Sequence, residues 1–244
     1  MTILETKNLI KRFNGIHAVD HLSIGIEKGE ITGIIGPNGS GKTTLINLLS
    51  GVLEIDGGEI VIDKAEKLTR LFPHDISLYG ITRTFQSVRL FEQMTVLDNI
   101  LVVTTERGVF SSLFEKHTEY HHKIAEDVLQ KVGLWEKKNQ LAVNLSYGQR
   151  KLLEIARTLA IKAEIYLFDE PFSGLFPEMR KIVSSIIREL KQENKTVVLI
   201  EHDMGLIREL CDYVFVMDEG KLLADGKPNH VLEQREVIET YLGE

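Results

Sequence analysis

Apolar residues recur along this chain with two periods, which together predict strands that alternate with helices. Largely apolar stretches at Ile31 to Ile35, Ile165 to Phe168 and Thr196 to Ile200 indicate buried strands. Apolar residues at helical spacing follow the first two of these strands, at Leu45, Ile46, Leu48 and Leu49 and again at Met179, Ile182, Val183, Ile186, Ile187 and Leu190. The alternation predicts an α/β fold.

Shorter alternating stretches predict antiparallel strands near the N-terminus. Strands are expected between Ile3 and Ile26, with turns at the turn-forming pairs Asn14-Gly15 and Lys28-Gly29. A further turn and strand are expected at Gly57 to Ile62. This region therefore differs from the rest of the chain, where strands and helices alternate.

Three later regions have patterns of their own. Residues 91–143 show helical spacing, for example at Ile124 and Val128, and predict a helical lobe inserted into the α/β core. A hairpin is expected to turn at Asp218-Glu219-Gly220. The tail from Val231 to Leu242 has helical spacing.

Composition narrows the class of protein. The chain has 244 residues, 43% of them hydrophobic, enough for one large α/β domain or a core with a small lobe. Its net charge is −7 and it contains no basic tract, so we expect no nucleic-acid partner. Cys211 is the only cysteine, which fits a reducing compartment. We expect neither a signal peptide at Met1 to Glu5 nor a membrane-spanning segment.

The candidate chemistry is centred on residues 36–44, which fit the phosphate-binding loop pattern G-x-x-x-x-G-K-[ST]. Glycines allow a tight loop whose peptide N–H groups turn toward phosphate oxygens. Lys42 adds a positive charge, and the Thr43 hydroxyl is a candidate Mg²⁺ ligand. The expected nucleotide-binding residues here are Gly36, Asn38, Gly39, Ser40, Gly41, Lys42, Thr43 and Thr44.

Polar residues follow two of the predicted buried strands. Asp169 and Glu170 end one strand, where a phosphate-binding loop needs a second Mg²⁺ anchor and a group that orients water. His202 ends another, at the edge where open α/β sheets bind ligands. The alternatives are a solvated strand end for the two acids and a turn or packing role for the histidine.

Other candidates are less specific. Ser146 and Gly148 open a helix and either hold an anion or only cap the helix. Phe13 either stacks on an adenine ring or packs in the core. His117 and His121 lie four residues apart, but no carboxylate or cysteine cluster accompanies them, so a solvated helix face is favoured over a metal site.

With these residues identified, the chain resembles the ATP-binding-cassette ATPases, the nucleotide-binding subunits of ABC transporters. The resemblance covers essentially the whole chain, and the motifs follow the family's order. Phe13 corresponds to the A-loop aromatic residue, Gly36 to Thr44 to Walker A, Gln86 to the Q-loop, Leu145 to Gln149 to the signature, Tyr166 to Asp169 with Glu170 to Walker B, Ser173 to Phe176 to the D-loop and His202 to the H-loop. The signature is the most diagnostic motif, because other P-loop classes lack it.

Within the family, the chain is most similar to the ATPases of branched-chain amino-acid importers. The similarity rests on Gly80 to Gln86, Arg89-Leu90-Phe91, Met94 to Leu97 and the ending Val237 to Gly243. Two positions depart from the family pattern. Tyr147 stands in the signature where Gly is commoner, and Phe176 stands in the D-loop where a polar Asp or Asn is usual.

The resemblance implies a P-loop NTPase fold, with a RecA-like core, an antiparallel β subdomain and an inserted α-helical subdomain. We expect a single ABC ATPase domain over residues 1–244. The core and the β subdomain would occupy residues 1–86 and 144–244, and the helical subdomain residues 87–143. The signature motif lies at residues 145–149.

The resemblance also implies the roles of the site residues. Two subunits would face head-to-tail, as a homodimer or a heterodimer, with ATP between the loop of one and Ser146, Gly148 and Gln149 of the other. The expected roles are adenine stacking by Phe13, phosphate binding by Lys42, Mg²⁺ binding by Thr43, Gln86 and Asp169, polarisation of the attacking water by Glu170, and contact with the γ-phosphate by His202.

The implied function is ATP hydrolysis that powers a transporter, with branched-chain or other amino acids as its imported substrates. The expected partners are integral-membrane permease subunits at the cytoplasmic face of the membrane and, indirectly, a substrate-binding protein. The alternatives are an exporter of lipid, lipopolysaccharide or other compounds, or a soluble ABC ATPase outside transport. The last class usually carries two cassettes or a long coiled-coil insertion, and this sequence has neither.

Overall fold

The buried strands expected from the sequence lie in one six-stranded sheet, in the order β11-β10-β4-β9-β8-β7. Five of them run parallel and β11 is antiparallel to β10. Each residue of β4, β8 and β9 is buried, as expected for strands with both faces covered. The strands are β4 (Ile31–Ile35), β7 (Ile81–Arg83), β8 (Ile165–Asp169), β9 (Thr196–Ile200), β10 (Tyr213–Asp218) and β11 (Lys221–Gly226).

The antiparallel strands expected near the N-terminus are confirmed and form a separate sheet. It has the order β2-β1-β5-β6, and β3 also pairs with β1. The expected turn at Asn14-Gly15 joins β1 to β2. The strands are β1 (Thr2–Phe13), β2 (Ile16–Leu22), β3 (Gly25–Glu27), β5 (Gly57–Ile62) and β6 (Glu66–Leu68).

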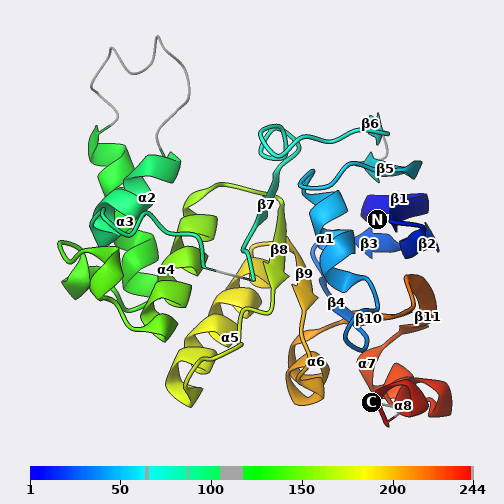
Figure 1. The fold of residues 1–244 in the computed structure, drawn as a ribbon. Helices are drawn as coiled ribbons and strands as arrows, with labels where there is room; N and C mark the ends of the chain where they lie inside the picture. Colours follow the sequence, from blue (N-terminus) through cyan, green and yellow to red (C-terminus); the bar gives the residue numbers. More distant parts are fainter. Residues whose placement is uncertain (64–65, 87, 105–117, 243–244) are drawn as a thin grey trace. The chain divides into compact units, whose positions relative to one another are not determined.

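The structure, a computed structural model, describes residues 1–63, 66–86, 88–104 and 118–242 (Figure 1). The chain divides into two compact units. The first consists of Met1–Arg83, Ala163–Glu170 and Ile187–Glu244, and contains both sheets. The second consists of Thr84–Lys162 and Pro171–Ile186, and contains the helices between β7 and β8.

Helix α1 (Lys42–Leu49) joins the two sheets of the first unit into one core. Figure 1 shows α1 between them, and its apolar residues belong to a buried cluster that draws on both sheets. Leu4 and Ile60 come from the antiparallel sheet, and Leu167 and Val198 come from the parallel one. Packing along the whole helix therefore fixes the position of its first residue, Lys42.

The second unit is helical, in accordance with the periodicity of its sequence. Helices α2, α3 and α4 all contact one another. The expected lobe of residues 87–143 lies inside this unit, together with α4 and the first part of α5. Its elements are α2 (Val96–Thr104), α3 (Thr118–Lys131), the 3₁₀ helices η3 (Trp135–Lys137) and η4 (Ala142–Asn144), α4 (Tyr147–Ala160) and α5 (Pro177–Gln192), which ends in the first unit.

The C-terminal tail is helical, but it is not one helix. Helix α6 (Met204–Leu210) precedes β10, and the tail forms α7 (Pro228–Val231) and α8 (Arg235–Leu242). Val231 and Val237 are both buried. On a continuous helix, residues six apart point about 120° away from each other, so the turn between α7 and α8 allows both valines to be buried.

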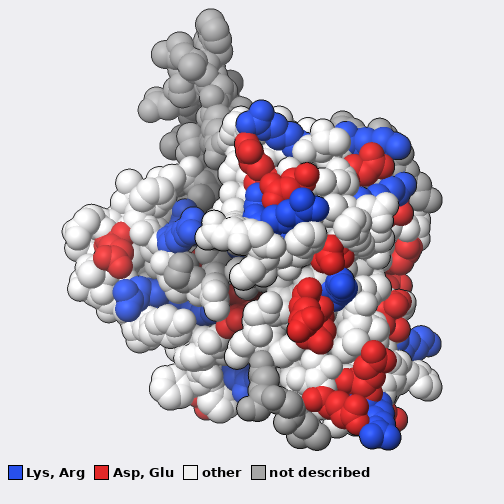
Figure 2. Space-filling model, turned by 45° about the vertical axis from the view of Figure 1, so that its right-hand side comes forward, with Lys and Arg blue, Asp and Glu red and all other residues white. Residues whose placement is uncertain are grey.

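The surface carries charges of both signs. On the face drawn in Figure 2, basic and acidic side chains are interspersed among uncharged ones. None of the helices in the described part of the chain has both the length and the apolar character that a bilayer crossing requires.

Candidate functional site

The phosphate-binding loop connects β4 to α1 in the first unit, and two of its glycines are required by close backbone contacts. Gly36 has φ 149°, and a Cβ atom there would lie 2.1 Å from the carbonyl oxygen of Met217. Gly41 has φ 100°, and a Cβ atom would lie 2.2 Å from the carbonyl oxygen of Ala18. Only glycine fits at these positions, so the loop is held tightly against β10 and β2.

Lys42 is the first residue of α1, and its ammonium group is buried within the loop. Its Nζ atom donates hydrogen bonds to the carbonyl oxygens of Gly36 and Pro37, both at 2.7 Å, and lies 3.4 Å from Ser40 Oγ. These oxygens compensate for the removal of the charge from water. Among the other loop residues, Asn38, Gly39 and Thr43 are exposed and Thr44 is half-buried, so part of the loop is open to a ligand.

The carboxyl ends of β8 and β9 bring the predicted acidic residues and histidine to the same edge of the sheet. Asp169 pairs with Ile200 in the parallel register, which places Glu170 beside the end of β9. Glu170 Oε1 lies 3.1 Å from His202 Nε2. The backbone of Glu170 is left-handed, with φ 49°, and its N–H group donates to the carbonyl oxygen of Ile200.

This edge also carries the phosphate-binding loop. Strand β4 is parallel to β9, with Ile34 beside Ile200, so the loop leaves the sheet at the end where Glu170 and His202 lie. Ligands bind at this end of open parallel sheets. The first unit therefore brings together the loop, Asp169, Glu170 and His202.

Phe13 ends β1, and its side chain does not lie in the core. It is 44% exposed, and the Lys11 ammonium lies 5.5 Å from the centre of its ring. The core-packing alternative for Phe13 is therefore wrong. An exposed ring is what stacking on a planar ligand requires.

The predicted anion site at the start of α4 lies in the second unit, and its helix cap is confirmed. Ser146 Oγ accepts a hydrogen bond from the Gln149 backbone N–H at 3.3 Å, and Gln149 Oε1 accepts from the Ser146 N–H at 3.1 Å. These reciprocal bonds form a capping box. Gly148 is buried in close contact with α5, since a Cβ atom there would lie 2.5 Å from the sulfur of Met179. Anion binding at this helix start stays a prediction.

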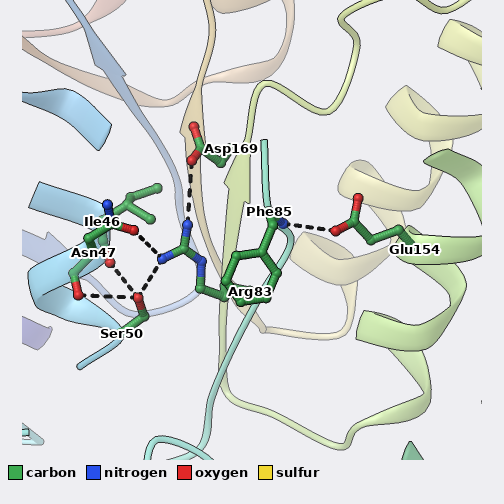
Figure 3. A network of polar contacts seen from close by, with 7 residues as sticks. All are labelled: Ile46, Asn47, Ser50, Arg83, Phe85, Glu154 and Asp169. Atoms are coloured by element: carbon green, nitrogen blue, oxygen red, sulfur yellow. Dashed lines mark hydrogen bonds and ion pairs between the residues drawn. The ribbon is translucent and has the colours of Figure 1, made fainter. Parts of the chain in front are cut away.

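Gln86 is exposed in a bend of the second unit. Phe85 before it and Arg89 after it form hydrogen bonds with side chains of α4. The Phe85 N–H donates to Glu154 Oε1 at 3.1 Å (Figure 3). Arg157 donates to the carbonyl oxygen of Arg89. Burial raises the pKa of Glu154 to about 7, although the bond from Phe85 and the charge of Lys151 act in the opposite direction.

The sequence did not single out Arg83, which contacts Asp169 in the first unit. Its guanidinium lies 3.5 Å from Asp169 Oδ2 (Figure 3). The available signal was a charged residue at the end of the short strand Ile81–Arg83, which precedes Gln86. Such a residue is either exposed at the strand end or paired inside, and only the tertiary structure distinguishes the two.

Of the two histidines four residues apart, His117 lies outside the described residues. In the described ranges, no three His, Cys, Asp or Glu side chains gather in a way that suits a metal ion.

Comparisons with known proteins agree on one family. Residues 19–173 match the family model described as ABC transporter. The chain is 39% identical to the high-affinity branched-chain amino acid transport ATP-binding protein LivG of Salmonella typhimurium, over 99% of this chain and 98% of the relative. It is similar to an ATP-binding cassette of an ABC transporter solved in its ADP conformation, with TM-score 0.86, 35% identity and full coverage of both chains. A dimeric cassette in a post-hydrolysis state, bound to ADP and Pi, has TM-score 0.81 and 26% identity, over 93% of this chain and 99% of that chain.

Proposed function

The chain belongs to the ABC transporter family, and we propose that it is the ATP-hydrolysing subunit of an importer of branched-chain or other amino acids. The observation that carries the ATPase assignment is the site in the first unit. There the buried ammonium of Lys42 and the Glu170–His202 pair lie at the same edge of the sheet. The similarity to LivG, which extends over nearly all of both chains, supports the substrate class.

In this proposal the loop binds the phosphates of ATP and Phe13 contacts the base. The peptide N–H groups from Gly36 to Thr44 would surround the phosphate oxygens at the start of α1, where the helix dipole also favours negative charge. Lys42 would supply a positive charge to the terminal phosphates. The exposed ring of Phe13 would stack on adenine.

The residues present fit a magnesium ion. Asp169 offers a buried carboxylate and Thr43 an exposed hydroxyl, and both are the hard oxygen ligands that Mg²⁺ prefers. We propose that Thr43 and Asp169, with Gln86 of the second unit, hold it directly or through water. When bound, Mg²⁺ would neutralise charge on the phosphate oxygens.

Glu170 and His202 are the proposed catalytic residues beside Lys42. Glu170 would accept a hydrogen bond from the attacking water and direct a lone pair of that water at the γ-phosphorus. His202, 3.1 Å from Glu170, would restrict the orientation of the carboxylate and contact the γ-phosphate. As in other phosphoryl-transfer sites, most of the rate enhancement would come from positioning and charge stabilisation.

A second ATPase subunit would complete the site. Ser146, Gly148 and Gln149 would contact the ATP that is bound to the loop of the partner, so that a two-fold pair contains two equivalent sites. ATP binds the closed pair preferentially and therefore favours closure. The pair would be a homodimer or a heterodimer, with its two subunits head-to-tail.

The proposed architecture places these parts in one ABC ATPase domain. We propose a RecA-like core and antiparallel β subdomain in residues 1–86 and 144–244, and a helical subdomain in residues 87–143. Val88 to Phe91 would contact the permease subunits, so the protein would lie on the cytoplasmic face of the membrane. A substrate-binding protein would deliver the amino acid to the permease from the other side.

Uptake measurements test the transport assignment. Deleting the gene is expected to abolish high-affinity uptake of labelled leucine, isoleucine or valine, and a plasmid copy should restore it. The matched control is a plasmid copy with Lys42→Ala, which should not restore uptake. Normal uptake of all amino acids together with a defect in lipid or drug export would overturn the importer assignment while leaving the ATPase assignment intact.

A further inference from the structure

Arg83 is the last residue of β7, and its charge is buried in the first unit. The side chain of Arg83 is 4% exposed and that of Asp169 is 1% exposed. Arg83 Nη1 donates to Asn47 Oδ1 at 2.8 Å and to Ser50 Oγ at 2.6 Å, and Nη2 lies 3.5 Å from Asp169 Oδ2 (Figure 3). One guanidinium thus contacts both the end of β8 and the last turn of α1.

The register of the sheet explains why these groups meet. Arg83 lies beside Leu167 in the parallel pairing of β7 with β8. Side chains alternate along a strand, so Asp169 lies on the same face as Leu167, two residues further on. Leu167 and the apolar residues of α1 share one core cluster, so this is the face that α1 covers.

The guanidinium suits this place because it is planar and has several donors in a fixed geometry. Its Nη1 atom binds two oxygens near the end of α1, while its Nη2 atom faces the carboxylate. Ser50 Oγ in turn donates to the carbonyl oxygen of Ile46 at 2.7 Å, so the hydroxyl that accepts from Arg83 is itself oriented. A buried carboxylate is costly unless it is paired, and Arg83 provides a paired charge.

We propose that Arg83 is a positioning residue that orients the carboxylate of Asp169 for the divalent cation of the nucleotide. The proposal rests on the proposed function, in which Asp169 and Thr43 hold that cation. Thr43 lies in the first turn of α1 and the contacts of Arg83 lie near its last turn. Arg83 therefore connects the two predicted cation ligands of the first unit through a single helix.

The test measures cation binding separately from nucleotide binding. Mn²⁺, detected by electron paramagnetic resonance, serves as the probe in the presence of saturating ADP. Binding of a fluorescent ADP analogue is measured in the presence of EDTA. Arg83→Gln is expected to weaken Mn²⁺ binding about 10-fold or more, as changes at groups that hold a metal ligand in place typically do. ADP binding without metal is expected to stay within about two-fold of wild type.

Three further variants make the result specific. Arg188→Gln, at an exposed arginine paired with Glu209, is the matched control and should bind Mn²⁺ as wild type does. Arg83→Lys retains the charge without the planar fork and should give an intermediate loss. Ser50→Ala removes one acceptor and leaves both charges in place, so it should weaken Mn²⁺ binding about three-fold, and it decides the question if Arg83→Gln does not fold.

Two results would overturn the proposal in distinguishable ways. If Asp169→Asn abolishes Mn²⁺ binding but folded Arg83→Gln binds it as tightly as Arg188→Gln, or more tightly, then Arg83 does not position the carboxylate. If Asp169→Asn also binds Mn²⁺ normally, the proposed metal role of Asp169 fails and the inference fails with it.

Discussion

At the scale of single residues, the site is built from polar and charged side chains that are matched by nearby groups, and Lys42 and Asp169 among them are buried. Lys42 is held by two carbonyl oxygens of its own loop at 2.7 Å, before any phosphate binds. Asp169 faces Arg83, and Glu170 faces His202. These contacts fix the side chains in advance, so less conformational freedom is lost when a ligand binds.

Lys42→Ala is the direct test of the phosphate-binding loop. The substitution removes a buried ammonium, and losing a charged hydrogen-bond donor to a desolvated phosphate costs about 3 kcal/mol, or about 100-fold in affinity. Titration with a fluorescent ATP analogue should show this loss. Lys7→Ala, at an exposed lysine on β1, is the control and should bind ATP normally. An unchanged affinity in Lys42→Ala would mean that the loop does not bind phosphate as proposed.

At the scale of elements, α4 combines three features along one helix. Its first turn has the capping box of Ser146 and Gln149, and its apolar residues pack in the second unit as the periodicity predicted. Two charged residues of the same helix, Lys151 and Glu154, are also buried, although a purely apolar stripe would not include them. Glu154 ties α4 to Phe85, the residue before Gln86, so the Q-loop segment is anchored on the helix that starts at the signature.

The buried carboxylate of α4 predicts a pH-dependent stability. The pKa of Glu154 is raised from 4.5 to about 7 in the folded chain, mainly by burial, so the folded state holds the proton more tightly than the unfolded state. Its contribution is fully present below pH 4.5 and is lost as the pH rises through about 7. Between these two pKa values the free energy of unfolding falls by about 1.4 kcal/mol for each pH unit.

Glu154→Gln should remove that slope, because the amide stays neutral and its oxygen can still accept from Phe85. Urea unfolding of both proteins between about pH 5 and about pH 7, the range that separates the two pKa values, would measure the difference. Glu178→Gln, at an exposed glutamate of α5, should retain the pH dependence of the wild type. Equal slopes in Glu154→Gln and wild type would show that Glu154 does not hold its proton more tightly in the folded chain.

At the scale of the whole molecule, the proposed closure on ATP needs two chains. Each chain has one phosphate-binding loop, and the proposed site at that loop is completed by the signature residues of the partner. Glu170→Gln should retain ATP binding and lose about 100-fold or more in turnover, since general-base catalysis typically contributes that much. The unhydrolysed ATP should then hold two copies together, and size-exclusion chromatography with Mg-ATP should show a dimer. Wild-type turnover in this variant would exclude Glu170 from the catalytic role.

A double variant separates dimerisation by ATP from dimerisation by the substitution itself. Lys42→Ala combined with Glu170→Gln should elute as a monomer at an ATP concentration that just saturates Glu170→Gln, because its affinity for the ATP that joins the two copies is about 100-fold lower. If the double variant also dimerises, the association does not depend on the nucleotide site.

Much of the molecule follows from local sequence patterns. The strand before the loop, the loop itself and the start of α1 are adjacent in the chain, so residues 31–49 suffice to predict their order and their chemistry. The hairpin at Asp218-Glu219-Gly220 and the cap at Ser146 are local in the same sense. The resemblance to the ABC ATPases rested on such motifs, and the comparisons confirmed the family.

Only the tertiary structure decided which distant groups meet. Spacing along the chain cannot show that Phe13 is exposed, that the tail turns between Val231 and Val237, or that His202 lies 3.1 Å from Glu170. Arg83 and Asp169 are 86 positions apart, and they meet because the parallel register places Arg83 beside Leu167. Periodicity predicts which face of an element is buried, whereas the register between elements determines which side chains share that face.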